Sequence, residues 1–141
     1  MNEKIIARAG EIIASKTGGG NDGYCVLALI GKDGFPSAST ISVSKADGIS
    51  VITFCTGLSG RKPERIAACS RASVCFCAAD YNITLVGTIE ILTDPEIKKD
   101  MWYDGLENHF SGPEDPEYCV LRFKTNRYNL LVDWKEAHGN L

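Results

Sequence analysis

The chain has 141 residues with a net charge of −3, and 44% of its residues are hydrophobic and 23% charged. This length is typical of one domain, so we treat residues 1–141 as a single domain whose core needs no disulfide or metal to fold. Because lysine and arginine form no block anywhere, we expect neither nucleic acid nor an anionic membrane surface as a partner.

The first segment, residues 4–16, is predicted to be an amphipathic helix. Its isoleucines recur at helical spacing while charged residues take the opposite face. The glycines at 18–20 end it. Charged residues interrupt the segment, and no apolar run approaches the roughly eighteen residues of a membrane span. We therefore expect a cytoplasmic protein that stays out of the membrane.

The following segments alternate between β-rich runs and turn residues. Strands are predicted at residues 24–30, 36–45 and 49–56, with tight turns between them. A short helix is predicted at residues 63–69, since proline is tolerated in a first helical turn.

The second half of the chain continues the same pattern. Strands are predicted at residues 72–79 and 83–92, a helix from Asp94 toward Phe110, and a last hairpin of strands 118–124 and 128–132. Strands do not alternate regularly with helices, which disfavours a doubly wound parallel sheet. The sequence predicts an α+β domain, a small antiparallel barrel of about seven strands with three flanking helices.

Six cysteines are spread over the chain, and without secretion we expect them to stay reduced. The one close pair, Cys75 and Cys77, has C-x-C spacing rather than the C-x₂-C of zinc sites. On a strand both would point to the same face. We expect the cysteines to act mainly as small hydrophobes, and we predict no metal site.

The most informative segment joins the third strand to the second helix. Small residues at 57–60 precede two cations, Arg61 and Lys62, at the start of the helix. Helix N-terminal N–H groups favour anions, glycine lets the backbone approach closely, and arginine grips phosphate oxygens in a fork. The pattern is that of a phosphate cradle. A solvated turn carrying two surface cations is the alternative.

Four motifs in this order resemble the pyridoxamine 5′-phosphate oxidase-like superfamily, in particular its general stress protein branch. They are the Gly34-Phe35-Pro36 turn with the strand after it, Phe54-Cys55-Thr56 with Arg61-Lys62 beyond it, the strand Leu85-Val86-Gly87-Thr88-Ile89-Glu90, and the tail from Trp102 to Tyr118. The resemblance covers most of the chain. It implies a split β-barrel that works as a homodimer, with flavin mononucleotide (FMN) at the subunit interface.

The resemblance also implies the residues that would bind the cofactor. The phosphate and ribityl chain would be held by Thr56, Gly60, Arg61 and Lys62. The isoalloxazine ring would lie over Ser39, Thr40 and Ile41, with Cys55 in the same pocket. Asn82 would reach the flavin from the other subunit, although an asparagine here is also a common turn residue.

Several positions depart from the vitamin B6 oxidases of this family. Ser39 and Ser44 stand where those enzymes place an arginine and a lysine, and Gly60 replaces a serine. Their C-terminal stretch with an arginine and a histidine is missing. We therefore expect no efficient vitamin B6 oxidation. We assign no catalytic residue, and we expect no catalytic role for His109 or His138.

Two functions stay open at this point. One is a flavin-dependent oxidoreductase with an unknown small-molecule electron donor and acceptor. The other is a non-catalytic flavin- or haem-binding module that buffers or senses redox state during stress. Related split barrels also bind deazaflavin, so the ligand is an expectation from the resemblance.

Overall fold

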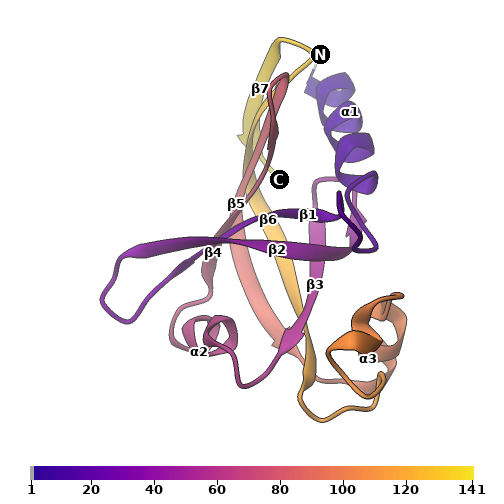
Figure 1. Cartoon of the computed structure of the whole chain (residues 1–141). Helices are drawn as coiled ribbons and strands as arrows, with labels where there is room; N and C mark the ends of the chain where they lie inside the picture. The colour runs from indigo at the N-terminus through magenta and orange to yellow at the C-terminus, as the bar shows by residue number, and fades with distance from the viewer. Residues whose placement is uncertain (1) are drawn as a thin grey trace.

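The computed structural model describes residues 2–141, in which seven strands and three α-helices are arranged around an antiparallel barrel (Figure 1). The helices are α1 (Asn2–Ala14), α2 (Arg61–Ala68) and α3 (Pro95–Met101), and a 3₁₀ turn, η1 (Leu106–Asn108), follows α3. The strands are β1 (Tyr24–Ile30), β2 (Pro36–Asp47), β3 (Val51–Gly57), β4 (Arg71–Ala78), β5 (Tyr81–Leu92), β6 (Tyr118–Val132) and β7 (Lys135–Asn140).

The barrel closes through a pairing between strands distant in sequence. The strand order is β3-β2-β1-β4-β5-β6-β7, and β3 also pairs antiparallel with β6. Six strands therefore form the closed barrel, and β7 extends the sheet beyond β6. The predicted α+β split barrel of about seven strands with three helices is confirmed.

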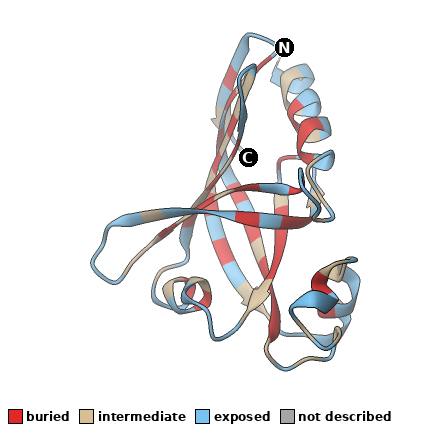
Figure 2. Cartoon of the chain, in the orientation of Figure 1, coloured by how far each residue is buried: buried red, intermediate tan, exposed pale blue. Residues whose placement is uncertain are grey.

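Alternation of side chains along the strands builds the core. On β1, Cys25, Leu27 and Leu29 point inward and are buried, while the residues between them are partly exposed. Figure 2 shows this alternation along the sheet. Helix α1 adds Ala9 and Ile13, which are both fully buried where it packs against β6 and β7.

The predicted long helix toward Phe110 is wrong, because the helix ends at Met101. Asp94 caps its start with a carboxylate that accepts from the N–H groups of Glu96 and Ile97. Trp102 then turns to an extended conformation, and Gly105 adopts a left-handed one with φ of 108°. The chain doubles back, so the segment after α3 folds over β3 instead of extending away.

The predicted last hairpin is also wrong in its details. Residues 118–124 and 128–132 form one continuous strand, β6, with a bulge where its register against β5 shifts beside Gly87. The strand that pairs with the second half of β6 is β7, which lies in the C-terminal tail, where no element was predicted. The predicted number of strands is right although two of them were placed differently.

Gly87 sits where the bulge brings two backbones together. A Cβ atom on Gly87 would lie 1.9 Å from the carbonyl oxygen of Lys124, far inside van der Waals contact. Thr125, in the bulge, donates from its Oγ1 to the carbonyl of Ile49 at 2.5 Å and from its N–H to that of Ser50 at 2.9 Å. The glycine of the Leu85–Glu90 motif is thus required by backbone packing.

Candidate functional site

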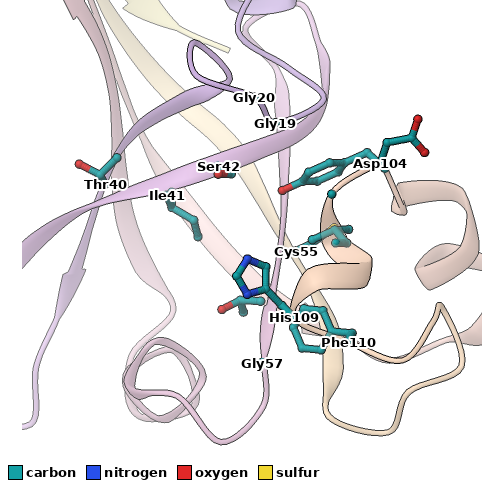
Figure 3. A pocket seen from close by; sticks show the side chains of 14 residues that line it. Gly19, Gly20, Thr40, Ile41, Ser42, Cys55, Gly57, Asp104, His109 and Phe110 are labelled. Atoms are coloured by element: carbon teal, nitrogen blue, oxygen red, sulfur yellow. The ribbon is translucent and has the colours of Figure 1, made fainter.

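One hollow, which we call the central pocket, lies between β2, β3 and the segment after α3 (Figure 3). Its volume is about 470 Å³. It is lined by Gly19, Gly20, Thr40, Ile41, Ser42, Cys55, Thr56, Gly57, Tyr103, Asp104, Gly105, Leu106, His109 and Phe110.

The pocket exists because β2 and β3 separate. Their pairing runs from Asp47 opposite Val51 to Val43 opposite Phe54, and no pair is formed beyond Val43. Residues 40–42 of β2 therefore pair with β1 on one side only, while their other edge faces the opening. Backbone N–H and carbonyl groups along this edge are available to a ligand.

Four of the predicted site residues are brought together here. Thr40 and Ile41 line the pocket from β2, and Cys55 and Thr56 line it from β3. Ser39 lies one residue outside, exposed on β2 and paired with Leu27 of β1. Residues predicted on two separate strands thus line one hollow.

Cys55 is a wall residue whose thiol is fixed by structural bonds. Its Sγ donates to the carbonyl oxygen of Met101 at 3.3 Å and lies 3.4 Å from the hydroxyl of Tyr118. The Tyr118 hydroxyl in turn donates to the carbonyl of Lys98 at 2.7 Å. Burial raises the pKa of the Cys55 thiol, so it is neutral at physiological pH. A neutral, doubly engaged thiol anchors α3 to β3 and is not an activated nucleophile.

Beyond Thr56 and Gly57 the chain enters the loop that leads into α2. Helix α2 begins at Arg61, two residues earlier than predicted, with Gly60 as an extended N-cap that provides no side-chain cap. Arg61 and Lys62 are thus the first two helical residues, and Pro63 is buried behind them. An uncapped helix N-terminus with two cations is a suitable environment for an anion.

Two side chains of this cradle do not line the central pocket. Arg61 faces a neighbouring hollow of about 360 Å³ that it shares with Gly31, Lys32, Asp33, Glu64 and Arg65. There Lys32 forms an ion pair with Glu64 at 2.8 Å, which ties the β1–β2 turn to α2. Lys62 is half-buried and lines neither hollow. The start of α2 is therefore connected to the pocket by the short segment from Thr56, which lines the pocket, to Arg61, the first residue of the helix.

Asn82 lies apart from the other predicted residues of the same chain. It stands at the start of β5, where its Oδ1 accepts from Cys75 at 3.4 Å and its Nδ2 donates to Thr84 at 2.9 Å. It pairs with Cys77 across the β4–β5 hairpin rather than serving as a turn residue.

The third wall of the pocket was not predicted from the sequence. Tyr103, His109 and Phe110 all come from the segment after α3, which was predicted to continue as a helix. In Figure 3 the imidazole of His109 points into the opening from this wall. The glycine run contributes too: Gly19, at φ of +73°, lies so close to Tyr103 that a Cβ would approach its ring to 2.5 Å. The glycine run predicted only the end of the first helix, and the motif from Trp102 to Tyr118 was not assigned to the cofactor site.

The cysteines and the other acidic and imidazole groups form no metal centre in residues 2–141. Cys25, Cys55 and Cys119 are buried, Cys69 and Cys75 partly so, and Cys77 is exposed. Burial raises the pKa of Cys25 to about 12, which is typical of a core thiol. Within the same residues no helix has the length and apolar character that crossing a membrane requires.

A family model of pyridoxamine 5′-phosphate oxidase matches residues 20–131, from the glycine run through both pocket strands to the end of β6. The chain belongs to the pyridoxamine 5′-phosphate oxidase family. No curated protein matches it at a significant level.

Solved structures of this oxidase family and its neighbours share the fold. One, from Clostridium acetobutylicum and related to general stress protein 26 of B. subtilis, is 26% identical over all of this chain and 97% of its own, with a TM-score of 0.84. A haem-binding protein from Mycobacterium smegmatis is 17% identical over 96% of this chain and 57% of its own, with a TM-score of 0.71. An FMN-binding protein from Nostoc punctiforme is 13% identical over 99% of this chain and 95% of its own, with a TM-score of 0.61.

Proposed function

We propose that this member of the pyridoxamine 5′-phosphate oxidase family binds FMN and acts as a flavin-dependent oxidoreductase in the cytoplasm. One observation carries the proposal: β2 and β3 separate into a pocket whose wall, at Thr56 and Gly57, continues through a short loop into an uncapped helix start bearing Arg61 and Lys62. FMN joins a flat ring to a phosphate, and along this chain a pocket for the ring is followed by an anion site for the phosphate.

The residues present fit the two ends of FMN. The central pocket is within the roughly 300–1,000 Å³ that small-molecule sites occupy. Ile41, Leu106 and Phe110 give it apolar surface, while the free edge of β2 offers backbone donors and acceptors for the ring. The α2 start would take the phosphate. Bound FMN would supply reversible electron transfer, and the chain's own part is to bind it, orient it and limit its exposure to water.

A second candidate is a non-catalytic haem- or flavin-binding module. His109 favours it, because imidazole is a common axial ligand of haem iron and this one is exposed in the opening of the pocket. The visible spectrum after separate addition of haem and FMN distinguishes the two ligands. For bound FMN, rapid bleaching by a nicotinamide and recovery with an acceptor favours the oxidoreductase, whereas a flavin that resists reduction favours the module. A haem spectrum that changes on His109→Ala, with FMN unbound, would replace the flavin proposal.

FMN added to the purified protein should co-elute on a desalting column with shifted absorption and quenched fluorescence. Arg61→Ala should weaken FMN binding by about 1.5–3 kcal/mol, roughly ten- to a hundredfold, as expected for losing a charge-assisted hydrogen bond. Fluorescence titration measures both affinities, with riboflavin as the phosphate-free ligand.

Arg8→Ala is the control for loss of a surface arginine, since Arg8 lies on α1, away from α2, with its side chain paired to Glu11 and Asp133. It should leave the FMN affinity within about twofold of the native value, because a charge far from the site is largely screened by salt. FMN passing unretained through the column at tens of micromolar contradicts the cofactor proposal. Equal losses for riboflavin and FMN would mean that Arg61 supports the fold rather than the phosphate.

We further propose that the protein is a homodimer, in which Asn82 of one subunit reaches the flavin of the other. On β3, the face that carries Cys55 is covered within the chain, by the end of α3 and the segment after it. The outer face of the sheet is different. Ala38, Ala28, Ser73 and Val86 form one cross-strand row from β2 to β5, and none of the four is buried within the chain. This row is suited to contact with a second copy, because its side chains are short and uncharged.

Sedimentation velocity at micromolar concentration should show a dimer. We expect its interface to bury more than about 1,000 Å². Ala28→Glu places a charge within the cross-strand row from Ala38 to Val86 and should shift the protein to monomer. Lys4→Glu, on the exposed face of α1, is the control for a change of charge alone and should leave the dimer intact. A native protein that sediments only as monomer rejects the dimer and removes Asn82 from the site.

A further inference from the structure

The loop between β3 and α2 already holds an anion, the side chain of Glu117. One oxygen of this carboxylate, Oε1, accepts from the backbone N–H of Ser59 at 2.6 Å and from the Ser59 hydroxyl at 2.5 Å. The backbone reinforces the contact, because the carbonyl of Glu117 accepts from the N–H of Leu58 at 2.8 Å. The loop residues just before the helix are therefore arranged as donors to an acid.

The position of Glu117 is set by the barrel itself. Tyr118, the next residue, is fully buried and pairs with Gly57 at the end of β3, which brings the carboxylate over the loop. Gly57 leaves the space, since a Cβ there would lie 3.0 Å from Oε1. Hydrogen bonds from Ser59 lower the pKa of Glu117 below its ordinary value, so the group is ionised throughout the neutral range.

We propose that Glu117 is a built-in competitor for the phosphate of the flavin and so determines how strongly this site prefers FMN to riboflavin. This inference rests on the proposed function. A phosphate placed at the start of α2 needs donors from the same loop, and its charge is repelled by the carboxylate that holds them. Phosphate binding therefore requires Glu117 to release Ser59, whereas riboflavin binding leaves the contact intact.

A purely structural role for Glu117 makes the opposite prediction. If the carboxylate only braced the loop, then removing its charge would loosen the site and weaken both flavins alike. A competitor, once neutralised, strengthens FMN binding alone. The ratio of the two affinities therefore separates the two roles without any assay of turnover.

The test is Glu117→Gln, which keeps the shape and one acceptor oxygen but removes the charge. We expect the affinity for FMN to rise by up to about fivefold, the upper end of an exposed ion-pair contribution, with riboflavin unchanged. Glu114→Gln is the control, an exposed acid three residues away that makes no contact with the loop. It should change the FMN affinity far less. Circular dichroism and the melting temperature check that each variant is folded.

Three results would overturn the inference: FMN affinity unchanged in Glu117→Gln, FMN affinity reduced, or both flavins shifted equally. Inorganic phosphate separates failure of the inference from failure of the flavin proposal. If the native protein binds neither flavin, but phosphate raises the melting temperature of Glu117→Gln more than that of the native protein, the competitor stands and the flavin function falls. If phosphate stabilises both equally, the competitor falls as well.

Discussion

The FMN-loaded protein should form pyridoxal 5′-phosphate from pyridoxamine or pyridoxine 5′-phosphate roughly two to four orders of magnitude less efficiently than a genuine oxidase of its family. A B6 substrate brings a second phosphate, which must be held beside the flavin ring, and an unpaired phosphate in a partly dry pocket costs several kcal/mol. Losing two cationic contacts at about 1.5–3 kcal/mol each gives the stated range.

The structure supports this expectation at the positions where the oxidases carry cations. No lysine or arginine is among the described residues that line the central pocket. Ser44 is buried and its hydroxyl donates to the carbonyl of Met101 at 2.5 Å, so the position serves to hold α3. Arg122 is engaged with Glu90 on the barrel wall.

The assay measures kcat/KM for pyridoxal phosphate formation, with the genuine oxidase as the parallel standard. Comparable values in the two proteins would refute the expectation. Arg122, Arg127 and Lys135 would then be the first residues to test as substrate ligands.

Gly87→Ala should destabilise the protein by about 3 kcal/mol, the upper end of the cost of overpacking, because the new methyl group meets a backbone carbonyl rather than a movable side chain. The added Cβ would lie 1.9 Å from the Lys124 oxygen, so β5 and β6 must move apart. For a chain of this size that corresponds to a melting temperature lower by about 10 °C.

Gly112→Ala is the control for this change, since its nearest neighbour to a new Cβ is the Glu114 carboxylate at 3.4 Å. Its unfolding free energy should change by less than about 0.5 kcal/mol, as for most surface substitutions. Urea unfolding of both variants measures the difference. Equal stabilities would show that the bulge accommodates a side chain, and the glycine would then need another explanation.

The parts of the fold predicted well are those with local signals. Strand β1 has the bounds expected from its alternation and flanking turns, and β3 differs from expectation by two residues at its start and one at its end. The pocket residues on β2 and β3 follow from those strands. The fold of the segment after α3 depends instead on packing: Trp102 and Phe110 contact the ring of Tyr118 on β6, at 5.3 and 5.4 Å between centroids.

Strand β7 was missed because its turn lacks the usual residues. Asp133 and Trp134 join β6 to β7, and both have positive φ, 51° and 63°. Two-residue hairpin turns of this kind normally contain Asn-Gly or Asp-Gly, and a tryptophan gives no such signal. Likewise, a turn was expected at residues 125–127, between the two predicted strands. The backbone instead continues as one strand through a bulge opposite Gly87.

Strand β6 belongs to two structural units. Its residues 118–124 pair with β3 and close the barrel, while residues 127–132 pair with β7 and lie beside α1. Strand β5 pairs with both halves. The bulge at Thr125 is the junction between them. Proteins often open in such cooperative units rather than all at once. Strand β7 pairs with β6 alone. Its amides should therefore exchange with solvent through a partial opening that leaves the barrel, and the central pocket in it, closed.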